Sequence, residues 1–373
     1  MTEEEFNEAR YSPKPRKAFK EIAQELNTML AKATAIASQI KFFSFDQFDK
    51  LYYGPKRSVD VFGYYRDYMA QLKEEGRPGT MESYQTSMVS LQKFLKEKNK
   101  KSTVLPFENV TANWLKEYER YMVALPRSIT TVGIYLRPLR ALYNLAIEDG
   151  NASKEFYPFT KRRYQIPGGR KAKKALPKTS LKLLLNANTE MSPEQEKAQD
   201  LWFFSFACNG INLKDVLELK WNNIHNDRIV FTRAKTRLTT KGNLLEIVVF
   251  RNEYIDRILE KYCTSNRKRE GYVFDILSEE MNAEEKRRIG KNLIRFINQH
   301  MRKLAEKQGI TEKVSYNWAR HSFTTKMMSE GASLEMLQEC LGHQSKQTTQ
   351  NYWGGFDDPT KKSFAANIMN FDS

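Results

Sequence analysis

The sequence is poor in cysteine, the residue that holds together small secreted domains and many metal sites. Only three of its 373 residues are cysteine, at positions far apart, and no two form a CxxC pair. This spacing excludes a disulfide framework and a cysteine-based metal clip. It is typical of a chain that works in a reducing cytoplasm.

Long apolar runs are missing as well. No stretch of about 18 apolar residues occurs, and the acidic opening MTEEEF does not resemble a signal peptide. We therefore expect no membrane role. The chain has no internal repeats and no low-complexity tract beyond one basic stretch, while its 40% apolar content is enough to form buried cores.

Acidic residues are outnumbered by basic ones. The chain has 61 Lys and Arg against 45 Asp and Glu, a net charge of +16. Such an excess indicates a polyanionic partner, although a soluble protein with a basic surface remains the alternative. The length predicts two or three domains.

The first part of the chain has helical periodicity. Residues 1–58 form a lead-in with an amphipathic helix at 18–40, and residues 59–160 form an all-helical domain. Its helices are predicted at 59–74, 80–98, 111–125 and 129–148. Thr80 and Thr111 are the predicted N-caps of the second and third helices.

A basic linker follows at 161–178, KRRYQIPGGRKAKKALPK, with eight basic residues and no acidic one. It is either a solvated connection between domains or a strap that also contacts phosphates, because each such contact releases a counterion. We expect it to contact DNA. The candidate DNA-binding residues are Lys161, Arg162, Arg163, Arg170, Lys171, Lys173 and Lys174.

Residues 179–373 have a mixed pattern and form the second domain. Helices are predicted at 180–187, 193–209, 212–219, 252–263, 283–308, 318–330 and 333–341. Between them, β-branched and polar residues alternate around a basic middle, which predicts a hairpin of 228–234 with 244–250.

The stretch LGHQSKQTTQNYW places His343 nine residues before Tyr352. Nine steps of an unbroken helix turn through about 900° and would put the two side chains on opposite sides. Gly342 ends one helix and Ser345 can begin the next. A break there lets the imidazole and the phenol meet in one pocket.

Several basic residues lie near this segment in sequence order. Arg320 and His321 occur in YNWARHSFTTKMM, and Arg233, Lys235 and Arg237 alternate in the predicted hairpin. Cleavage of a phosphodiester needs a nucleophile, a cationic clamp and an acid for the leaving alkoxide. Taken singly, each motif is more often structural: the His–Tyr spacing a capped helix end with a core aromatic residue, and the basic residues a solvated surface.

Taken in order, these motifs resemble the tyrosine recombinase (phage integrase) family, and most closely the integrases of integrative and conjugative elements. The segments ARHSF, LGHQS and NYW match its Arg-bearing helix, its LGH motif and its tyrosine. RAKT matches the strand-borne lysine, and FACNGINLKDVLELKW resembles the segment in which Gly-Leu-Arg opens a helix. The resemblance covers about Lys17 to Phe364.

The resemblance implies a role for each matched residue. Tyr352 would attack the scissile phosphate, forming a 3′-phosphotyrosyl link and freeing a 5′-hydroxyl. Arg320 would hold the phosphoryl oxygens, His343 would hydrogen-bond one of them, and Lys235 would protonate the leaving oxygen. Neither a metal nor another cofactor is implied. A tyrosine pKa near 10 means that the phenol needs a base or a strongly cationic site.

Two positions depart from the family pattern. Asn212 stands where the first arginine is usual, and Asn317 stands where a histidine precedes the second. Asn212, with Asp215 three residues on, has the pattern of a helix N-cap, while Asn317 can donate a hydrogen bond but accepts no proton. The sequence therefore does not determine the level of recombinase activity. Arg233 or Arg237, on the Lys235 face of the predicted strand, is the candidate replacement for the missing cation.

The family fold implied is mainly α-helical with a small antiparallel β-sheet. It is a two-domain C-shaped DNA clamp of a SAM-like core-binding domain and a catalytic domain; an arm-binding domain is not apparent in 1–58. The implied setting is double-stranded DNA in the bacterial cytoplasm, a homotetramer on paired sites and accessory DNA-bending proteins. The implied reaction is integration or excision of a mobile element. The alternatives are a recombinase-derived DNA-binding protein and a type IB topoisomerase-like enzyme.

Overall fold

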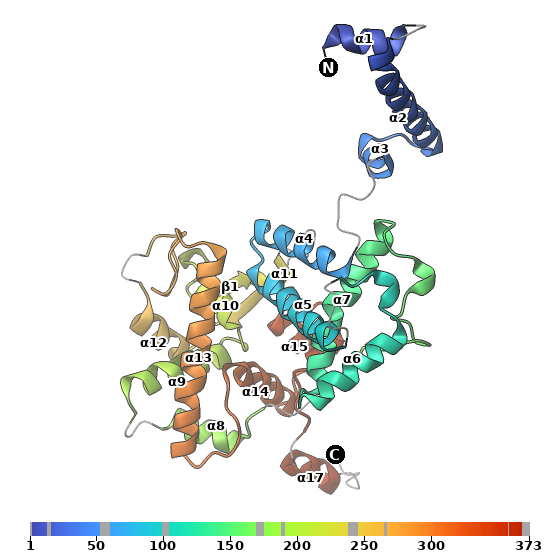
Figure 1. The fold of residues 1–373 in the computed structure, drawn as a ribbon. Coiled ribbons are helices and arrows are strands. Elements are labelled where there is room, and N and C mark those ends of the chain that lie inside the picture. Colours follow the sequence, from blue (N-terminus) through green and yellow to red (C-terminus); the bar gives the residue numbers. More distant parts are fainter. Residues whose placement is uncertain are drawn as a thin grey trace. The chain divides into compact units, whose positions relative to one another are not determined.

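The chain divides into two compact units, residues 1–169 and residues 170–373 (Figure 1). The computed structural model describes residues 2–12, 16–52, 60–98, 104–168, 175–187, 191–237, 245–264, 267–356 and 358–367. Within these residues the fold is mainly helical with one two-stranded antiparallel sheet, which confirms the predicted fold class. None of the described helices is long and apolar enough to cross a lipid bilayer.

The described N-terminal residues are helical. They form α1 (Glu3–Tyr11), a 3-10 turn η1 (Lys17–Phe19), α2 (Lys20–Gln39) and α3 (Phe45–Tyr52). α1 begins with a capping box, in which Thr2 and Glu5 each accept a hydrogen bond from the other's backbone amide. α2 confirms the helix predicted at 18–40, and none of its residues is buried.

The described residues from 60 to 168 form a bundle of four α-helices, with two 3-10 turns. The elements are α4 (Val61–Glu74), α5 (Pro78–Lys98), η2 (Phe107–Asn109), α6 (Ala112–Ala124), α7 (Ile129–Glu148) and η3 (Lys154–Phe156). Thr111 caps α6 as predicted by accepting from the amide of Trp114. The predicted cap at Thr80 is wrong, because α5 already begins at Pro78, and proline suits the first helical turn.

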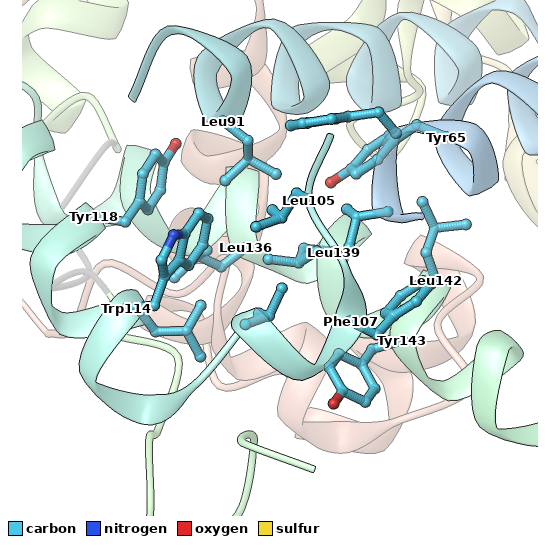
Figure 2. Packing of buried hydrophobic residues seen from close by; sticks show 14 of the residues in the cluster. Tyr65, Leu91, Leu105, Phe107, Trp114, Tyr118, Leu136, Leu139, Leu142 and Tyr143 are labelled. Atoms are coloured by element: carbon cyan, nitrogen blue, oxygen red, sulfur yellow. The ribbon is translucent and has the colours of Figure 1, made fainter. Parts of the chain in front are cut away.

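Aromatic and leucine side chains together fill the core of this bundle, as Figure 2 shows. Tyr65 and Tyr118 are completely buried, so each hydroxyl needs an internal partner. Tyr65 pairs with Ser87 at 2.7 Å, and Tyr118 pairs with Ser90 at 2.7 Å. The bundle therefore buries large apolar area without leaving these polar groups unpaired.

Both described ends of the predicted linker pack on their own unit. Tyr164 is buried in the first unit and its hydroxyl donates to Glu119 at 2.6 Å. A Cβ atom added to Gly133 would lie 2.3 Å from the carbonyl oxygen of Pro167, so only glycine allows that contact. In the second unit, the Leu176 amide donates to Ser322 Oγ at 2.9 Å.

The second unit contains the sheet and the remaining helices. Its elements are α8 (Lys178–Leu185), α9 (Pro193–Ala207), α10 (Leu213–Leu217), η4 (Trp221–Asn223), β1 (Arg228–Thr232), α11 (Ala234–Arg237), β2 (Glu246–Phe250), α12 (Glu253–Tyr262), α13 (Ala283–Lys307), α14 (Tyr316–Ser329), α15 (Leu334–Leu341), α16 (Lys346–Gln350) and α17 (Asp358–Asn367). β1 and β2 are antiparallel, with Arg228 opposite Phe250 and Thr232 opposite Glu246. The predicted strand pair is confirmed, with shorter strands.

α9 is the central helix of this unit. It packs against α12, α13 and α14, and its second half is buried on nearly every side. Trp202 is fully buried there, and its indole Nε1 donates to the Ser315 carbonyl at 3.0 Å, at the residue that precedes α14. The core of the unit thereby fixes where α14 begins.

A buried carboxylate joins α9 to α12. Asp200 is 1% exposed and accepts from Arg257 at 3.0 Å, from Lys261 at 2.8 Å and from the Tyr262 hydroxyl at 2.9 Å. Hydrogen bonds that involve a charged group contribute more than neutral ones. The network therefore holds the two helices in register.

We expect Asp200→Ala to lower the free energy of unfolding by about 2–3 kcal/mol, because four donors, the Tyr254 hydroxyl included, lose a buried acceptor. Glu196→Ala is the matched control. Glu196 also binds Lys261, but its side chain is 47% exposed, so its loss should cost about 0.5 kcal/mol or less. Urea unfolding followed by circular dichroism measures both. Equal losses in the two variants would contradict a special role for the buried carboxylate.

Candidate active site

The break between His343 and Tyr352 lies where the sequence predicted it. α15 ends at Leu341, and Gly342 adopts a left-handed φ of 59° as its C-cap. A Cβ at Gly342 would lie 2.5 Å from Ile247 Cδ1 on β2, so glycine is required for packing as well. After the break, the rings of His343 and Tyr352 stack with centroids 5.2 Å apart.

Arg320 projects from α14 into the same place and is 5% exposed. Its Nη1 donates to the Gly210 carbonyl at 2.8 Å, and its Nη2 donates to the Leu341 carbonyl at 2.7 Å. Nη2 also lies 3.0 Å from His343 Nε2. Its Nε has no hydrogen-bonding partner among the described residues, so this buried donor is available to a ligand.

Gly210 allows the close approach that orients Arg320. Its φ is +67°, and a Cβ there would lie 2.7 Å from the Cα of Arg320. Both the backbone conformation and the lack of space require glycine. The guanidinium is therefore aimed by the backbone of a loop 110 residues away.

Arg233 is the second buried guanidinium, at 8% exposed. Its Nη1 donates to the Gly342 carbonyl at 3.4 Å, next to His343. Burial and then the charge of Arg233 lower the pKa of Arg320 to about 10. Arg320 remains a cation at neutral pH, and an anion bound between the two groups would relieve their repulsion.

The alternation predicted for Arg233, Lys235 and Arg237 on one strand face is wrong. β1 ends at Thr232, and residues 234–237 form the short helix α11, in which residues two apart do not share a face. Lys235 is exposed and close enough for its charge to depress the pKa of His343. The side chain of Arg237 lies outside the described part of the structure.

Asp215 accounts for the turn from strand to helix. Its Oδ1 accepts from the Ala234 amide at 2.9 Å, and its side chain is 6% exposed. The charge of Asp215 also favours the Arg320 cation. This carboxylate thus connects α10 to α11, next to Arg233, and its negative charge stabilises the Arg320 cation.

The two asparagines differ in position. Asn212 occupies the N-cap position of α10 as expected, but its side chain makes no cap hydrogen bond and donates to Asp215 at 3.4 Å. Asn317 lies exposed on α14, three residues before Arg320. A helix places residues three apart on adjacent turns of one face, so Asn317 lies on the face that presents Arg320.

His343 is neutral at physiological pH. Burial, followed by the charges of Arg320, Arg233 and Lys235, lowers its pKa to about 3. Its Nδ1 lies 3.0 Å from Thr349 Oγ1, and Thr349 is fully buried. Sequence reasoning missed Thr349, although its position three residues before Tyr352 places it one helical turn away.

His321, named above beside Arg320 without a role, is a second contact of Tyr352. Its ring lies 4.7 Å from the Tyr352 ring, and its Nδ1 lies 3.1 Å from the Tyr352 carbonyl oxygen. A carbonyl only accepts, so Nδ1 carries the proton. Tyr352 also has the Cζ of Arg320 5.2 Å from its ring centroid.

Of the proposed linker contacts, three lie in the described part. Lys161 and Arg162 are exposed, and Arg163 is exposed while its Nη1 donates to the carbonyls of Glu155 and Tyr157. Arg170, Lys171, Lys173 and Lys174 lie outside the described residues. Within the described part, no group of three His, Cys, Asp or Glu side chains is placed to hold a metal ion.

The arrangement brings a tyrosine hydroxyl and a cationic site together in one chain. Tyr352 supplies a hydroxyl next to Arg320, while Arg233 and Lys235 add positive charge on the side of His343. Buried guanidinium groups bind the nonbridging oxygens of a phosphodiester with directed hydrogen bonds. Such a site can support attack of a phenol on phosphorus.

Two sequence models match the chain. The phage integrase SAM-like domain matches residues 60–166, and the phage integrase family matches residues 174–356. Tyrosine recombinase XerD of Oceanobacillus iheyensis is 22% identical over 288 residues, which is 73% of this chain and 86% of the relative.

Solved structures show the same fold. The XerH site-specific recombinase bound to palindromic difH substrate has a TM-score of 0.56 at 18% identity, covering 91% of this chain and 93% of that one. The Tn1549 transposon integrase in complex with a circular intermediate DNA has a TM-score of 0.54 at 15% identity, covering 83% and 100%.

Proposed function

Because this chain belongs to the tyrosine recombinase, or phage integrase, family, we propose that it is a site-specific DNA recombinase that works through a 3′-phosphotyrosyl intermediate. One observation carries the assignment of the nucleophile. The phenol ring of Tyr352 lies beside the buried Arg320 guanidinium and against His343 in the same chain. A nucleophile and its cationic clamp are thus assembled without a second subunit.

The reaction divides among four side chains. Tyr352 Oη attacks the scissile phosphorus, and Arg320 binds the nonbridging oxygens as charge builds on them. Lys235 gives a proton to the leaving 5′-oxygen, and His343 hydrogen-bonds the phosphoryl group. The phosphotyrosyl ester keeps the energy of the broken bond, so the strand can be rejoined when a 5′-hydroxyl attacks.

Arg233 supplies the cation that is missing at Asn212. It is buried, its guanidinium reaches the Gly342 carbonyl, and its charge acts directly on Arg320. Asn212 instead faces Asp215. Arg233, directly after the end of β1, therefore supplies the positive charge that the family usually has at the first arginine position.

Replacing Arg233 tests this substitution. We expect Arg233→Ala to slow cleavage of a nicked suicide substrate by about 10²- to 10³-fold, the loss typical of one transition-state donor. Arg228→Ala is the control, because Arg228 is an exposed residue of the same strand paired with Asp227. Arg237→Ala is measured in parallel. A larger loss in Arg237→Ala than in Arg233→Ala would assign the role to Arg237.

Double-stranded DNA is the proposed partner, contacted by the core-binding domain at 59–160, the linker at 161–178 and the catalytic domain at 179–373. The exposed Lys161 and Arg162 and the net charge of +16 support binding to the phosphate backbone. Assembly as a homotetramer on paired sites, with accessory DNA-bending proteins, would serve integration or excision of a mobile element.

Binding-site selection followed by a denaturing gel tests the function. The proposal expects a selected DNA sequence and a covalent protein–DNA band that forms without added magnesium or ATP. Tight, salt-dependent binding without this band would instead indicate a DNA-binding protein of recombinase descent that no longer cuts, as Asn212 and Asn317 also allow. Supercoil relaxation with no sequence preference would indicate a topoisomerase-like enzyme.

A further inference from the structure

The imidazole of His343 has a contact on each ring nitrogen. Nε2 lies 3.0 Å from Arg320 Nη2, and Nδ1 lies 3.0 Å from Thr349 Oγ1. His343 is 2% exposed and Thr349 is 0% exposed, so bulk water does not compete for the hydrogen-bonding groups of either contact. The ring is therefore held in a defined orientation inside the unit.

These contacts determine the tautomer. Arginine has donors only, so Nε2 must offer its lone pair to Arg320. The proton of the neutral ring then lies on Nδ1 and is donated to the Thr349 hydroxyl, which can accept it. His343 thus presents an unprotonated Nε2 toward Arg320, while the face of its ring stacks on Tyr352.

The proposed reaction needs an acceptor for the phenolic proton of Tyr352, and an unprotonated nitrogen of His343 can serve as that acceptor. Tyr352 must lose its phenolic proton to attack, and Asn317 cannot accept it. When a phosphodiester binds, its oxygens compete for Arg320 Nη2 and leave the Nε2 lone pair accessible. The phosphate charge also opposes Arg320, Arg233 and Lys235, the cations that depress the pKa of His343.

We propose that Thr349 is a positioning residue that stabilises the Nδ1–H tautomer selected by Arg320, so that Nε2 of His343 serves as the general base for Tyr352. The inference rests on the proposed function and deepens it. It assigns this chain's proton acceptor to His343 because the position three residues before Arg320 holds asparagine.

The proton balance of the step is complete. As the Tyr352 Oη–P bond forms and the P–O5′ bond breaks, the phenolic proton passes to His343 Nε2, and Lys235 gives a proton to the 5′-oxygen. The resulting imidazolium donates from Nδ1 to Thr349 and from Nε2 to a nonbridging oxygen. During rejoining, His343 returns its proton to the departing phenolate and Lys235 takes one from the attacking 5′-hydroxyl.

Thr349→Val removes the acceptor and keeps the shape of the side chain. We expect cleavage of the suicide substrate to slow by about 10- to 100-fold, while Thr349→Ser stays near the wild-type rate. Thr348→Val is the matched control, because Thr348 is exposed on the same helix one residue earlier. DNA binding, measured separately, should not change in any of the three variants.

The pH profile separates a proton-transfer role from a packing role. Thr349 stabilises the charged ring by accepting from Nδ1–H, which raises the His343 pKa in the complex. Its removal lowers that pKa, so the acidic limb of the cleavage profile should move to lower pH in Thr349→Val. A slower variant with an unmoved limb would overturn the proposal and reduce Thr349 to a packing residue.

The tautomer itself can be observed without any activity. In protein labelled with 15N-histidine, the ring-nitrogen signals distinguish protonated from unprotonated positions, and His343→Gln identifies those of His343. We expect a protonated Nδ1 in the wild type and a larger fraction of the Nε2–H tautomer in Thr349→Val, where the buried Nδ1–H has lost its acceptor. An Nε2–H tautomer in the wild type would overturn the inference even if the DNA adduct forms normally.

His321 is the competing base, because its Nδ1–H is donated to the Tyr352 carbonyl and its Nε2 is unprotonated in the neutral ring. His321→Asn keeps a donor near Nδ1 and removes the base. We expect the pH profile of DNA cleavage by this variant to keep its acidic limb. Loss of the limb there would transfer the base role to His321, whereas a wild-type chain that forms no adduct would refute the proposed function instead.

Discussion

Tyr352→Phe should abolish the covalent protein–DNA species and leave DNA binding intact. The change removes one oxygen atom, and that atom is the one proposed to form the bond to phosphorus. The ring keeps its place between His321 and His343, at 4.7 Å and 5.2 Å, because those contacts are made by the ring. The site is therefore preserved while the chemistry is removed.

The measurement is a denaturing gel of a nicked suicide substrate, with a gel-shift assay on the same DNA. Tyr262→Phe is the control, because it removes a hydroxyl that serves only the Asp200 network and should leave the adduct unchanged. An adduct that persists in Tyr352→Phe would assign the nucleophile to another residue. That outcome would remove the basis for the roles of Arg320, His343 and Thr349 around the Tyr352 hydroxyl.

Arg320→Ala should slow cleavage by about 10³-fold or more. The variant deletes the buried cation beside the proposed nucleophile and all of its directed donors, and such arginines contribute on this scale in phosphoryl transfer. It also leaves the carbonyls of Gly210 and Leu341 without their donor. A loss of stability of about 1–3 kcal/mol should accompany the loss of rate.

Arg320→Lys separates the two effects. Lysine keeps the charge, but its single ammonium cannot replace the planar guanidinium that contacts two carbonyls and a phosphate at once. We therefore expect a rate between those of wild type and Arg320→Ala. Lys326→Ala is the control within α14, since Lys326 forms an ion pair with Glu330 at the helix end. A single-turnover rate for Arg320→Ala within tenfold of wild type would contradict the assigned clamp.

Local sequence patterns predicted most of the elements and the family. Helix α7 is predicted and observed at 129–148, and Thr111 and Gly342 act as the expected cap and break. The two family models confirm the resemblance drawn from ARHSF, LGHQS and NYW. These features could be predicted because periodicity, capping and breaker residues act within about one helical turn of the backbone.

The contacts that build the site were beyond such patterns. The strand β1 ends at Thr232, just before Arg233, where the Ala234 amide donates to Asp215, 19 residues before Ala234. No property of the segment RAKTR itself requires that turn. The expected alternation on one strand face failed for this reason, and Arg233 entered the buried site instead.

The sequence by itself determined that this protein is helical, which family it belongs to, and that a tyrosine, a histidine and an arginine meet near its C-terminal end. Only the tertiary structure decided how they meet: Arg320 is aimed by the Gly210 carbonyl, and His343 takes its tautomer from Arg320 and Thr349. The physical reason is the distance along the chain over which the deciding interactions act. Helices form from interactions between near neighbours, whereas the direction of a donor and the position of a proton depend on whichever groups the fold packs against them.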